Sequence, residues 1–311
     1  MRALAAGAEF DAIAPLQPPA KFMLDDCRVG DPAFAAQVLA SATRHKVEAR
    51  ALAVRTLLHL PRVAAHNGRI GLRQLEAELR NCAVGLRADQ QKVEDLIPTR
   101  SFPLADLRFV ECAGDGEVVE IFNHLHYLRS ARPGSRNFAL VDPVDGRPVT
   151  LCSVTPLEWP VVGKQLGKQF GIPLDRIWDV SRVYSFDVAP SNAISYMLSR
   201  VRAVLRGPEV ELLTTAVDPN LGFTGSSYRA ANWQHWLSVK PRPYLYVDGS
   251  YLSPRQLRLR YGTANLSEVR AQSGALVQHS RARLVESKIF CCRVRGETES
   301  LTPGEARLVR R

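Results

Sequence analysis

The chain has 311 residues, a formal net charge of +10 and a hydrophobic fraction of 46%, enough for one large domain or two ordinary ones. It has no run of eighteen apolar residues, and Glu9 and Asp11 interrupt its first apolar stretch, so we predict neither a membrane span nor a signal peptide. None of its six cysteines belongs to a C-x-x-C pair, which argues against zinc and is typical of free thiols in a cytoplasmic protein.

The first hundred residues carry helical patterns. Residues 1–31 are rich in Ala and Pro and indicate a loose segment, and apolar residues recur at helical spacing over 32–60. The stretch 69–97 then predicts a helix, a short turn and a second helix. Such a pair is either a helix-turn-helix that reads DNA or a helical cap, and we favour the cap because the turn has no specific signature. Residues 1–105 are therefore assigned to a helical N-terminal extension.

From Arg108 the pattern changes to short strands, turns and helices. The sequence predicts a strand on each side of the turn Gly114–Gly116, a hairpin over 137–155, a loop or insertion over 156–173, a strand over 175–186, a helix over 189–207, a strand over 208–218, a helix over 225–237 and a hairpin over 242–253. Alternating strands and helices predict an α/β domain over 106–311.

The end of the chain is strongly basic. From Tyr251 onward there are twelve Lys and Arg residues against five Asp and Glu residues. A basic region favours a polyanionic partner such as DNA, although a solvated basic surface is an equally good explanation of charge alone. Arg255, Arg258 and Arg260 are the candidates for phosphate contacts.

The strand and helix over 177–205 could hold an anion. Free backbone N–H groups at a helix start bind phosphates, and Ser191 and Asn192 lie at this start, where they could instead cap the helix. Ser195 lies one turn further on, where it either contacts a ligand or lies on the helix flank. Arg182, within the strand, either faces solvent or reaches a carboxylate or phosphate with its planar guanidinium.

Three further positions could carry chemistry. Asp218 closes a strand, where carboxylates often face a ligand crevice, but it also precedes Pro219 as a turn-forming Asp would. In an extended "FNHLHYL", His124 and His126 would share one side and Tyr127 would lie opposite. Two such histidines supply a base or half of a metal site, whereas a structural or surface role is the more frequent outcome.

Three blocks in this order resemble a known family. They are "HYL" (His126–Leu128), "SRVYSFDVAPSNAISYMLS" (Ser181–Ser199) and "AVDPNLGFTGSSYRAANW" (Ala216–Trp233). Residues 123–240 resemble the phage Mom family of DNA-modification proteins, which are distant members of the GNAT acyltransferase fold. On this resemblance Arg182, Ser195, Asp218 and Tyr228 fall on functional positions of the family.

The resemblance implies a fold and an activity. The fold would be α/β, a GNAT-like mixed β-sheet flanked by helices, and the activity an anti-restriction conversion of adenine in phage DNA to an N6-carbamoylmethyl form. The implied partner is DNA, the implied donor is acetyl-CoA or a related molecule, and iron has been proposed for Mom-type proteins. No His shortly precedes the Gly-x-x-Tyr segment here, and the GNAT phosphate-loop glycines are absent; both departures argue against conventional use of acetyl-CoA.

Roles for the candidate residues follow from this resemblance. Tyr228 would protonate the leaving thiolate, since a phenol is protonated at neutral pH. The other catalytic candidates are Asp218, His126 and Tyr127, and the cofactor-binding candidates are Arg182, Ser191, Asn192 and Ser195; a metal site, if present, would use His124 and His126. The oligomeric state is left open, with a homodimer among the options.

Two alternatives remain at this stage. The last block also resembles Druantia-type defence proteins, and a helical N-terminal part would suit a DNA-binding protein of that type. An ordinary GNAT acyltransferase that acts on a small amine or a protein is the third hypothesis, and it would not need the basic C-terminal region.

Overall fold

The computed structural model describes residues 23–24, 32–65, 69–112, 116–298 and 307–309. The predicted loose segment 1–31 lies outside the described residues except for its strand β1 (Met23–Leu24), and so do Arg310 and Arg311 of the basic end. Within the described ranges, no helix combines the length and the apolar character that crossing a bilayer requires.

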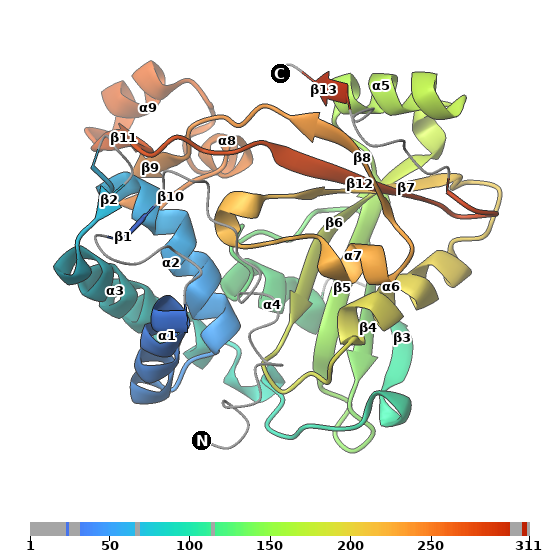
Figure 1. The fold of residues 1–311 in the computed structure, drawn as a ribbon, viewed down its shortest axis with the longest axis horizontal. Helices are drawn as coiled ribbons and strands as arrows, with labels where there is room; N and C mark the ends of the chain where they lie inside the picture. The colour runs from blue at the N-terminus through green and yellow to red at the C-terminus, as the bar shows by residue number, and fades with distance from the viewer. Residues whose placement is uncertain (1–22, 25–31, 66–68, 113–115, 299–306, 310–311) are drawn as a thin grey trace.

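A mixed sheet lies at the centre of the fold (Figure 1). In the described part of the chain it has eight strands in the order β13-β8-β12-β7-β6-β5-β4-β3. Their bounds are β3 (Arg108–Cys112), β4 (Arg136–Val141), β5 (Pro148–Pro156), β6 (Ile177–Ser185), β7 (Leu212–Val217), β8 (Gln234–Val239), β12 (Ser287–Arg293) and β13 (Arg307–Val309). Neighbours pair antiparallel except β6 with β7 and β8 with β13. The predicted α/β class, a mixed β-sheet flanked by helices, is confirmed, and the GNAT-like assignment stays a prediction.

The central strands are buried on both faces, which explains their continuous apolar runs. In β7, Leu212 packs in a cluster with the apolar side of α5 (Pro160–Phe170), whereas Leu213 packs with α6 (Ala193–Val204). In β12, Ile289 and Phe290 divide between the same two clusters. The alternation of side chains along a strand thus places α5 and α6 on opposite faces of the sheet.

Four helices pack together beside this sheet. They are α1 (Pro32–His45), α2 (Ala49–Val63), α3 (Leu72–Gln91) and α4 (Glu117–His124), and Figure 1 shows α1–α3 in blue and teal at one side of the molecule. Their apolar faces share one cluster with Leu151 of β5 and Tyr184 of β6. The predicted extension therefore shares its core with the sheet, and a division at residue 105 stays a prediction.

Three sequence predictions of local structure were wrong. The proposed helix-turn-helix over 69–97 is a two-residue strand, β2 (Arg69–Ile70), and one continuous helix, α3, because nothing between Leu79 and Leu86 breaks the helical pattern except Gly85, which a helix tolerates. The second strand expected after Gly114–Gly116 is the helix α4, and the loop expected over 156–173 contains the helix α5, which Pro160 begins and Gly171 ends.

Strands β6 and β7 separate after only three paired positions. Their last pair is Asp179 with Thr214, although both strands continue. Immediately beyond that point the pairing of β5 with β6 skips Ser181, since Val154 pairs with Val180 and Ser153 with Arg182. An extra residue of this kind bends a strand and re-aims its side chains. The bulge and the separation together open the sheet at Ser181.

Residues 240–286 form an insertion between the neighbouring strands β8 and β12. It consists of β9 (Leu245–Val247), β10 (Ser250–Tyr251), α8 (Pro254–Tyr261), α9 (Leu266–Ser273) and β11 (Val277–His279). Its strands form a three-stranded sheet, and its helices pack on that sheet around Leu257 and Val269. The predicted hairpin over 242–253 is β9 with β10. Tyr246 donates to the carbonyl of Leu58 at 2.8 Å, so the insertion contacts α2.

Candidate functional site

A cavity of about 150 Å³ lies where β6 and β7 separate. We call it the central cavity; its polar lining includes His126 and Tyr127, Arg182 on β6, Thr215 on β7 and Tyr228 on α7 (Ser226–Ala230), together with Ser181, Thr224, Ser226 and Ser227. A second cavity of about 120 Å³ shares His126, Tyr127, Val183, Ile194 and Phe223 with it and reaches α2. Four of the predicted site residues, distant in sequence, thus meet in one place.

Gly225 places Tyr228 in this cavity. It precedes α7 with a φ of 80°, a left-handed conformation that favours glycine. A Cβ atom at this position would lie 2.5 Å from the ring of Phe290. At the other end, Asn232 has a φ of 62° and turns the chain into β8, while Trp233 is buried in the core. The backbone conformations at Gly225 and Asn232 therefore explain why the Gly-x-x-Tyr and Asn-Trp motifs have these residues. The predicted longer helix ends at Ala230.

The Tyr228 side chain is held by rings and meets one polar partner. Its ring stacks on Phe290 at 5.9 Å between centroids and meets Trp233 edge-on at 5.3 Å. Thr215 Oγ1 donates to its hydroxyl at 3.4 Å. Burial raises the pKa of Tyr228 above its usual range, so the phenol keeps its proton at neutral pH. The group offered to the cavity is a neutral hydroxyl.

His126 is buried and neutral. Its Nδ1 accepts from the backbone N–H of Leu128 at 3.2 Å, which assigns the ring proton to Nε2. Burial, and then the charge of Arg182, lower the pKa of His126 well below 6.5. In this tautomer the ring offers a hydrogen-bond donor, whereas the role of base considered from the sequence would need the other tautomer.

Tyr127 lies beside His126, with 4.4 Å between ring centroids, and its ring also contacts Phe223 at 5.8 Å. Burial and then the carboxylate of Asp218 raise the pKa of Tyr127, so this phenol too stays protonated. Tyr127 is part of both cavities. The two phenols and the imidazole therefore supply three neutral polar groups to the central cavity.

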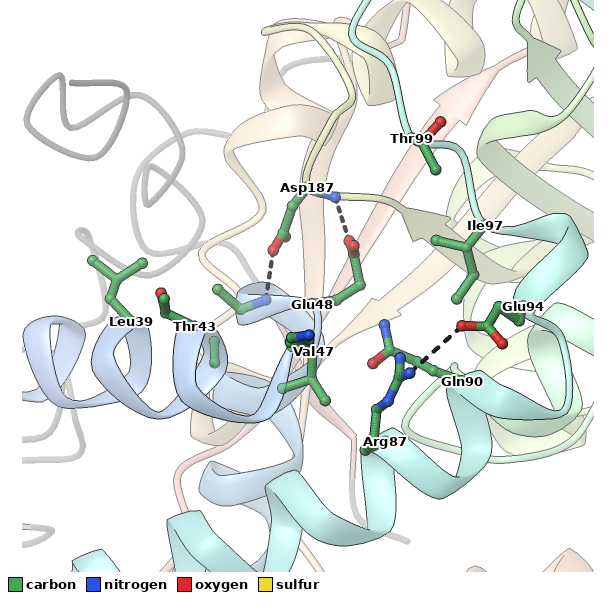
Figure 2. A pocket seen from close by; sticks show the side chains of 13 residues that line it. Leu39, Thr43, Val47, Glu48, Arg87, Gln90, Glu94, Ile97, Thr99 and Asp187 are labelled. Carbon is green, nitrogen blue, oxygen red and sulfur yellow. Dashed lines mark hydrogen bonds and ion pairs between the residues drawn. The ribbon is translucent and has the colours of Figure 1, made fainter. Parts of the chain in front are cut away.

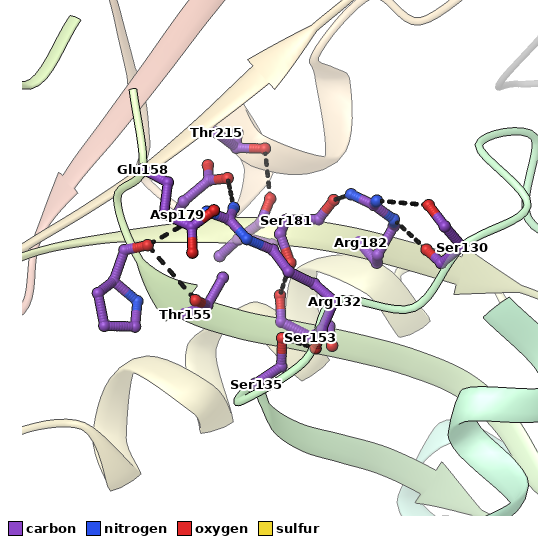
Figure 3. A network of polar contacts seen from close by, with 12 residues as sticks. Ser130, Arg132, Ser135, Ser153, Thr155, Glu158, Asp179, Ser181, Arg182 and Thr215 are labelled. Atoms are coloured by element: carbon purple, nitrogen blue, oxygen red, sulfur yellow. Dashed lines mark hydrogen bonds and ion pairs between the residues drawn. The ribbon is translucent and has the colours of Figure 1, made fainter. Parts of the chain in front are cut away.

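Arg182 is buried and held by the segment that follows Tyr127. Its Nε donates to the carbonyl of Ser130 at 2.8 Å and its Nη2 to the Ser130 hydroxyl at 3.1 Å, while Nη1 donates to the carbonyl of Ser181 (Figure 3). The solvent-facing alternative is therefore wrong, because Arg182 is only 9% exposed. Its guanidinium brings a fixed positive charge to the central cavity.

Asp218 is held in a turn, as one of the two sequence interpretations proposed. Its Oδ1 accepts from the backbone N–H and the side-chain amide of Asn220, at 2.9 and 2.7 Å. Its Oδ2 accepts from the Tyr244 hydroxyl of the insertion at 2.5 Å. Asp218 is not among the residues that line the central cavity, but its charge acts on Tyr127. The carboxylate thus lies behind Tyr127.

The start of α6 contributes to the cavity through Ile194 alone. Asn192 precedes α6 with a φ of 67° and makes no side-chain cap, and Ser191 is exposed. Ser195 is buried, and its hydroxyl donates to the carbonyl of Asn192 at 2.9 Å. The capping alternative is wrong for Asn192, and a cofactor role for Ser191, Asn192 and Ser195 stays a prediction.

The two histidines are not arranged as an extended strand would place them. His124 lies at the end of α4, where its Nε2 is 3.3 Å from Glu120, whereas His126 lies in the turn that follows. The predicted geometry was wrong because helical spacing continues from Glu117 to His124. Within the described ranges, no group of three or more His, Cys, Asp or Glu side chains could hold a metal ion.

The three arginines of α8 divide into two kinds. Arg258 and Arg260 are exposed, whereas Arg255 is half-buried and its charge acts on Arg182. The neighbouring Gln256 donates to the carbonyl of Leu128 at 2.7 Å, which fixes α8 against the turn that carries His126 and Tyr127. A basic helix therefore borders the cavity, and its contact with DNA stays a prediction.

Sequence reasoning missed a half-buried ion pair close to the cavity. Arg132 contacts Asp179 at 3.2 Å and Glu158 at 2.9 Å (Figure 3). Burial raises the pKa of Asp179 to about 6, against the opposing charges of Arg132 and Arg182. Trp236 lies outside the central cavity, where it packs on Phe170 and donates to Gln169. No local pattern marks the pair, because its members are 47 residues apart.

Comparisons with known proteins add a family. A family model described as the Mom protein family matches residues 109–290. No curated protein matches the chain. Among solved structures, a candidate acetyltransferase of Sphaerobacter thermophilus DSM 20745 is 12% identical, over 66% of this chain and 87% of that one, with a TM-score of 0.27. That likeness is too low to carry an argument. The Druantia-type resemblance finds no support in these matches and stays a hypothesis.

Proposed function

Because the chain belongs to the Mom protein family, we propose that it transfers a small group to the exocyclic amine of a base in phage DNA, with adenine N6 and a carbamoylmethyl group as the specific case. The observation that carries this proposal is the meeting of Arg182, His126, Tyr127 and Tyr228 in the central cavity. A base within a duplex must leave the stack to enter such a cavity.

The polar groups suggest a division of work. Arg182 and the Nε2–H of His126 would hold an electron-rich oxygen of the donor, since both are donors and one carries a fixed positive charge. The base nitrogen then forms a bond to the donor carbon as the bond to the leaving group breaks. Tyr228 would give its proton to that leaving group. The amine would lose its proton to the Asp218 carboxylate by relay, with the neutral Tyr127 hydroxyl taking up the amine proton as it passes its own to Asp218.

The donor is proposed to be acetyl-CoA or a related molecule. A thioester would acylate the amine with loss of its thiolate, whereas a carbamoylmethyl product would need a donor whose methylene carbon bears the leaving group. The start of α6 supports an anionic donor, because no Asn192 side-chain cap takes the first N–H groups. Iron fits less well, because the described residues contain no cluster of three or more His, Cys, Asp or Glu side chains that could hold it. No step of the proposal therefore uses a metal.

The DNA backbone is proposed to lie on α8. Arg258 and Arg260 are exposed there, and α8 is attached to the turn that carries His126 and Tyr127 through Gln256. Between Lys240 and Glu286, eight Lys and Arg residues stand against three Asp and Glu residues. Duplex DNA bound on this insertion would lie next to the central cavity.

Nucleoside mass spectrometry of DNA from cells that express the chain tests this function. We expect a modified nucleoside with the wild type and none with Arg182→Met, whose side chain fills similar space without charge. Tyr196→Phe serves as the matched control, because Tyr196 does not line the central cavity. An unmodified profile from cells in which the wild-type protein is folded and abundant would refute the proposal.

A further inference from the structure

A separate cavity of about 420 Å³ lies among the N-terminal helices (Figure 2). We call it the helical cavity. Its apolar wall comes from Leu39, Ala42, Val47 and Ile97, and its rim carries the exposed residues Thr43, Lys46, Glu94 and Thr99. At its inner end lie Glu48, Gln90 and Asp187. Its lining shares no residue with the central cavity.

Glu48 and Asp187 face each other across this inner end. Asp187 follows β6, and its carboxylate accepts from the backbone N–H groups of Ala49 and Arg50 at the start of α2, at 2.5 and 3.2 Å. In return, Glu48 Oε2 accepts from the Asp187 N–H at 2.5 Å (Figure 2). Two carboxyl groups are thus held close together by backbone donors.

Glu48 retains a proton for a physical reason. Burial and then the charge of Asp187 raise the pKa of Glu48 to about 8. The hydrogen bond from the Asp187 N–H and the charge of Arg50, whose Nε lies 3.8 Å from Asp187, oppose this rise. Tyr184 lies close enough for the charge of Glu48 to raise its pKa, and it is uncharged at neutral pH. At the rim, Arg87 is engaged with Glu94 at 3.5 Å. A cation next to Glu48 could therefore replace its proton.

Gln90 supplies an independent sign of a ligand. Its side chain is 3% exposed and lines the helical cavity, yet its Oε1 has no hydrogen-bond partner among the described residues. A buried carbonyl oxygen without a donor is costly, so such groups are normally satisfied by protein, water or ligand. Glu48 and Gln90 thus both bring acceptors to the lining of the helical cavity.

We infer that the helical cavity binds a small organic cation, a primary ammonium or guanidinium with an alkyl stem. Its N–H groups would donate to Gln90 Oε1 and to the Glu48 carboxylate, and its stem would lie against Leu39, Val47 and Ile97. An anion would meet acceptors at the inner end, and a metal ion would lack ligands, since the described residues form no cluster of three or more metal-binding side chains. This inference is independent of the proposed function.

Isothermal titration calorimetry of the full chain with putrescine and agmatine tests the inference, with inorganic phosphate and Mg²⁺ as the other probes. Titrations at about pH 7 in two buffers of different ionisation enthalpy measure the protons exchanged. We expect saturable binding of at least one organic cation with release of protons. Absence of saturable binding by both, or tighter binding of phosphate or Mg²⁺, would overturn it.

Variants locate the site. Gln90→Leu and Glu48→Gln should each weaken binding at least about tenfold, and Glu48→Gln should also abolish the proton release. Glu76→Gln, an exposed position of α3 outside the cavity, should bind as the wild type does. Thermal melts show whether each variant folds, and Glu48→Gln keeps an acceptor for the Asp187 N–H if Gln90→Leu does not fold. Unchanged binding in a folded Glu48→Gln variant would refute the site.

Discussion

At the scale of single residues, the half-buried Tyr228 and the buried Tyr246 each have a polar partner, yet their surroundings differ. Tyr228 lines the central cavity, whereas the hydroxyl of Tyr246 donates to the carbonyl of Leu58 between the insertion and α2. A hydroxyl that only forms a hydrogen bond affects stability, and one that transfers a proton affects rate. Removing each hydroxyl in turn therefore distinguishes a structural hydrogen bond from a proton transfer.

Tyr228→Phe should lower the rate of DNA modification by roughly 10²–10⁴ with little change in melting temperature, since its 3.4 Å contact with Thr215 is weak. Tyr246→Phe should do the reverse, costing about 1 kcal/mol of stability with modification unchanged. Nucleoside mass spectrometry and thermal melts measure the two quantities. If Tyr228→Phe keeps nearly full activity, the hydroxyl is a packing group.

His126 should stay neutral at neutral pH. Its pKa is lowered well below 6.5 by burial and then by Arg182, so its ring NMR signals should show the Nε2–H tautomer and should not titrate between about pH 6 and 8, the range of an ordinary histidine. A titration midpoint of His126 in that range would contradict the assignment.

At the scale of elements, the helix α8 combines two surfaces. Leu257 packs it against the rest of the insertion, and Gln256 attaches it to the turn after α4. Arg258 and Arg260 face solvent. Because one face is fixed by packing, changes on the other face should alter binding without altering the fold. Each phosphate contact releases counterions and adds to the salt dependence of DNA affinity.

Arg258→Ala with Arg260→Ala should weaken DNA binding and make the slope of log K against log salt shallower by roughly 0.9 for each phosphate that these arginines neutralise. The matched control removes two exposed arginines of α3, Arg73 and Arg80, and should leave the slope unchanged. Binding isotherms at several salt concentrations give both slopes. Equal slopes for the α8 variant and the wild type would place the DNA elsewhere.

The contact between Glu48, at the start of α2, and Asp187, in the segment after β6, should make stability depend on pH. The folded-state pKa of Glu48 is raised from 4.5 to about 8, so the folded state binds the proton more tightly than the unfolded state does. The contribution of Glu48 to the free energy of unfolding is therefore greatest below pH 4.5, and it falls as pH rises from 4.5 to about 8. Glu48→Gln should flatten this part of the curve of unfolding free energy against pH. A slope identical to that of the wild type would exclude Glu48 as its source.

At the scale of the whole molecule, helices and sheet depend on each other. Arg55 of α2 contacts Asp89 of α3 at 2.7 Å and donates to the carbonyl of His124 at the end of α4. The apolar side of α4 packs in the same cluster as α1–α3, and the turn after α4 carries His126 and Tyr127. The N-terminal helices therefore support one wall of the site.

A fragment of residues 106–311 should not fold as an independent domain. Removal of α1–α3 would expose Val118, Ile121, Phe122 and Leu125, each at most 5% exposed in the whole chain. Circular dichroism melts and gel filtration should show a broad, non-cooperative transition or aggregation. A cooperative melt of the isolated fragment would instead support the division at residue 105 suggested by the sequence.

The sequence by itself determined the α/β class, the strands β6 and β7, the helix α6, the hairpin of the insertion and the family, because these depend on local periodicity and on motif residues such as Gly225 whose backbone conformation few others adopt. Only the tertiary structure decided that Arg182 is buried against Ser130, that His126 carries its proton on Nε2, and that Arg132 pairs with Asp179. The physical reason is that burial and partners, which set the charge and proton position of a polar group, come from residues far away in sequence.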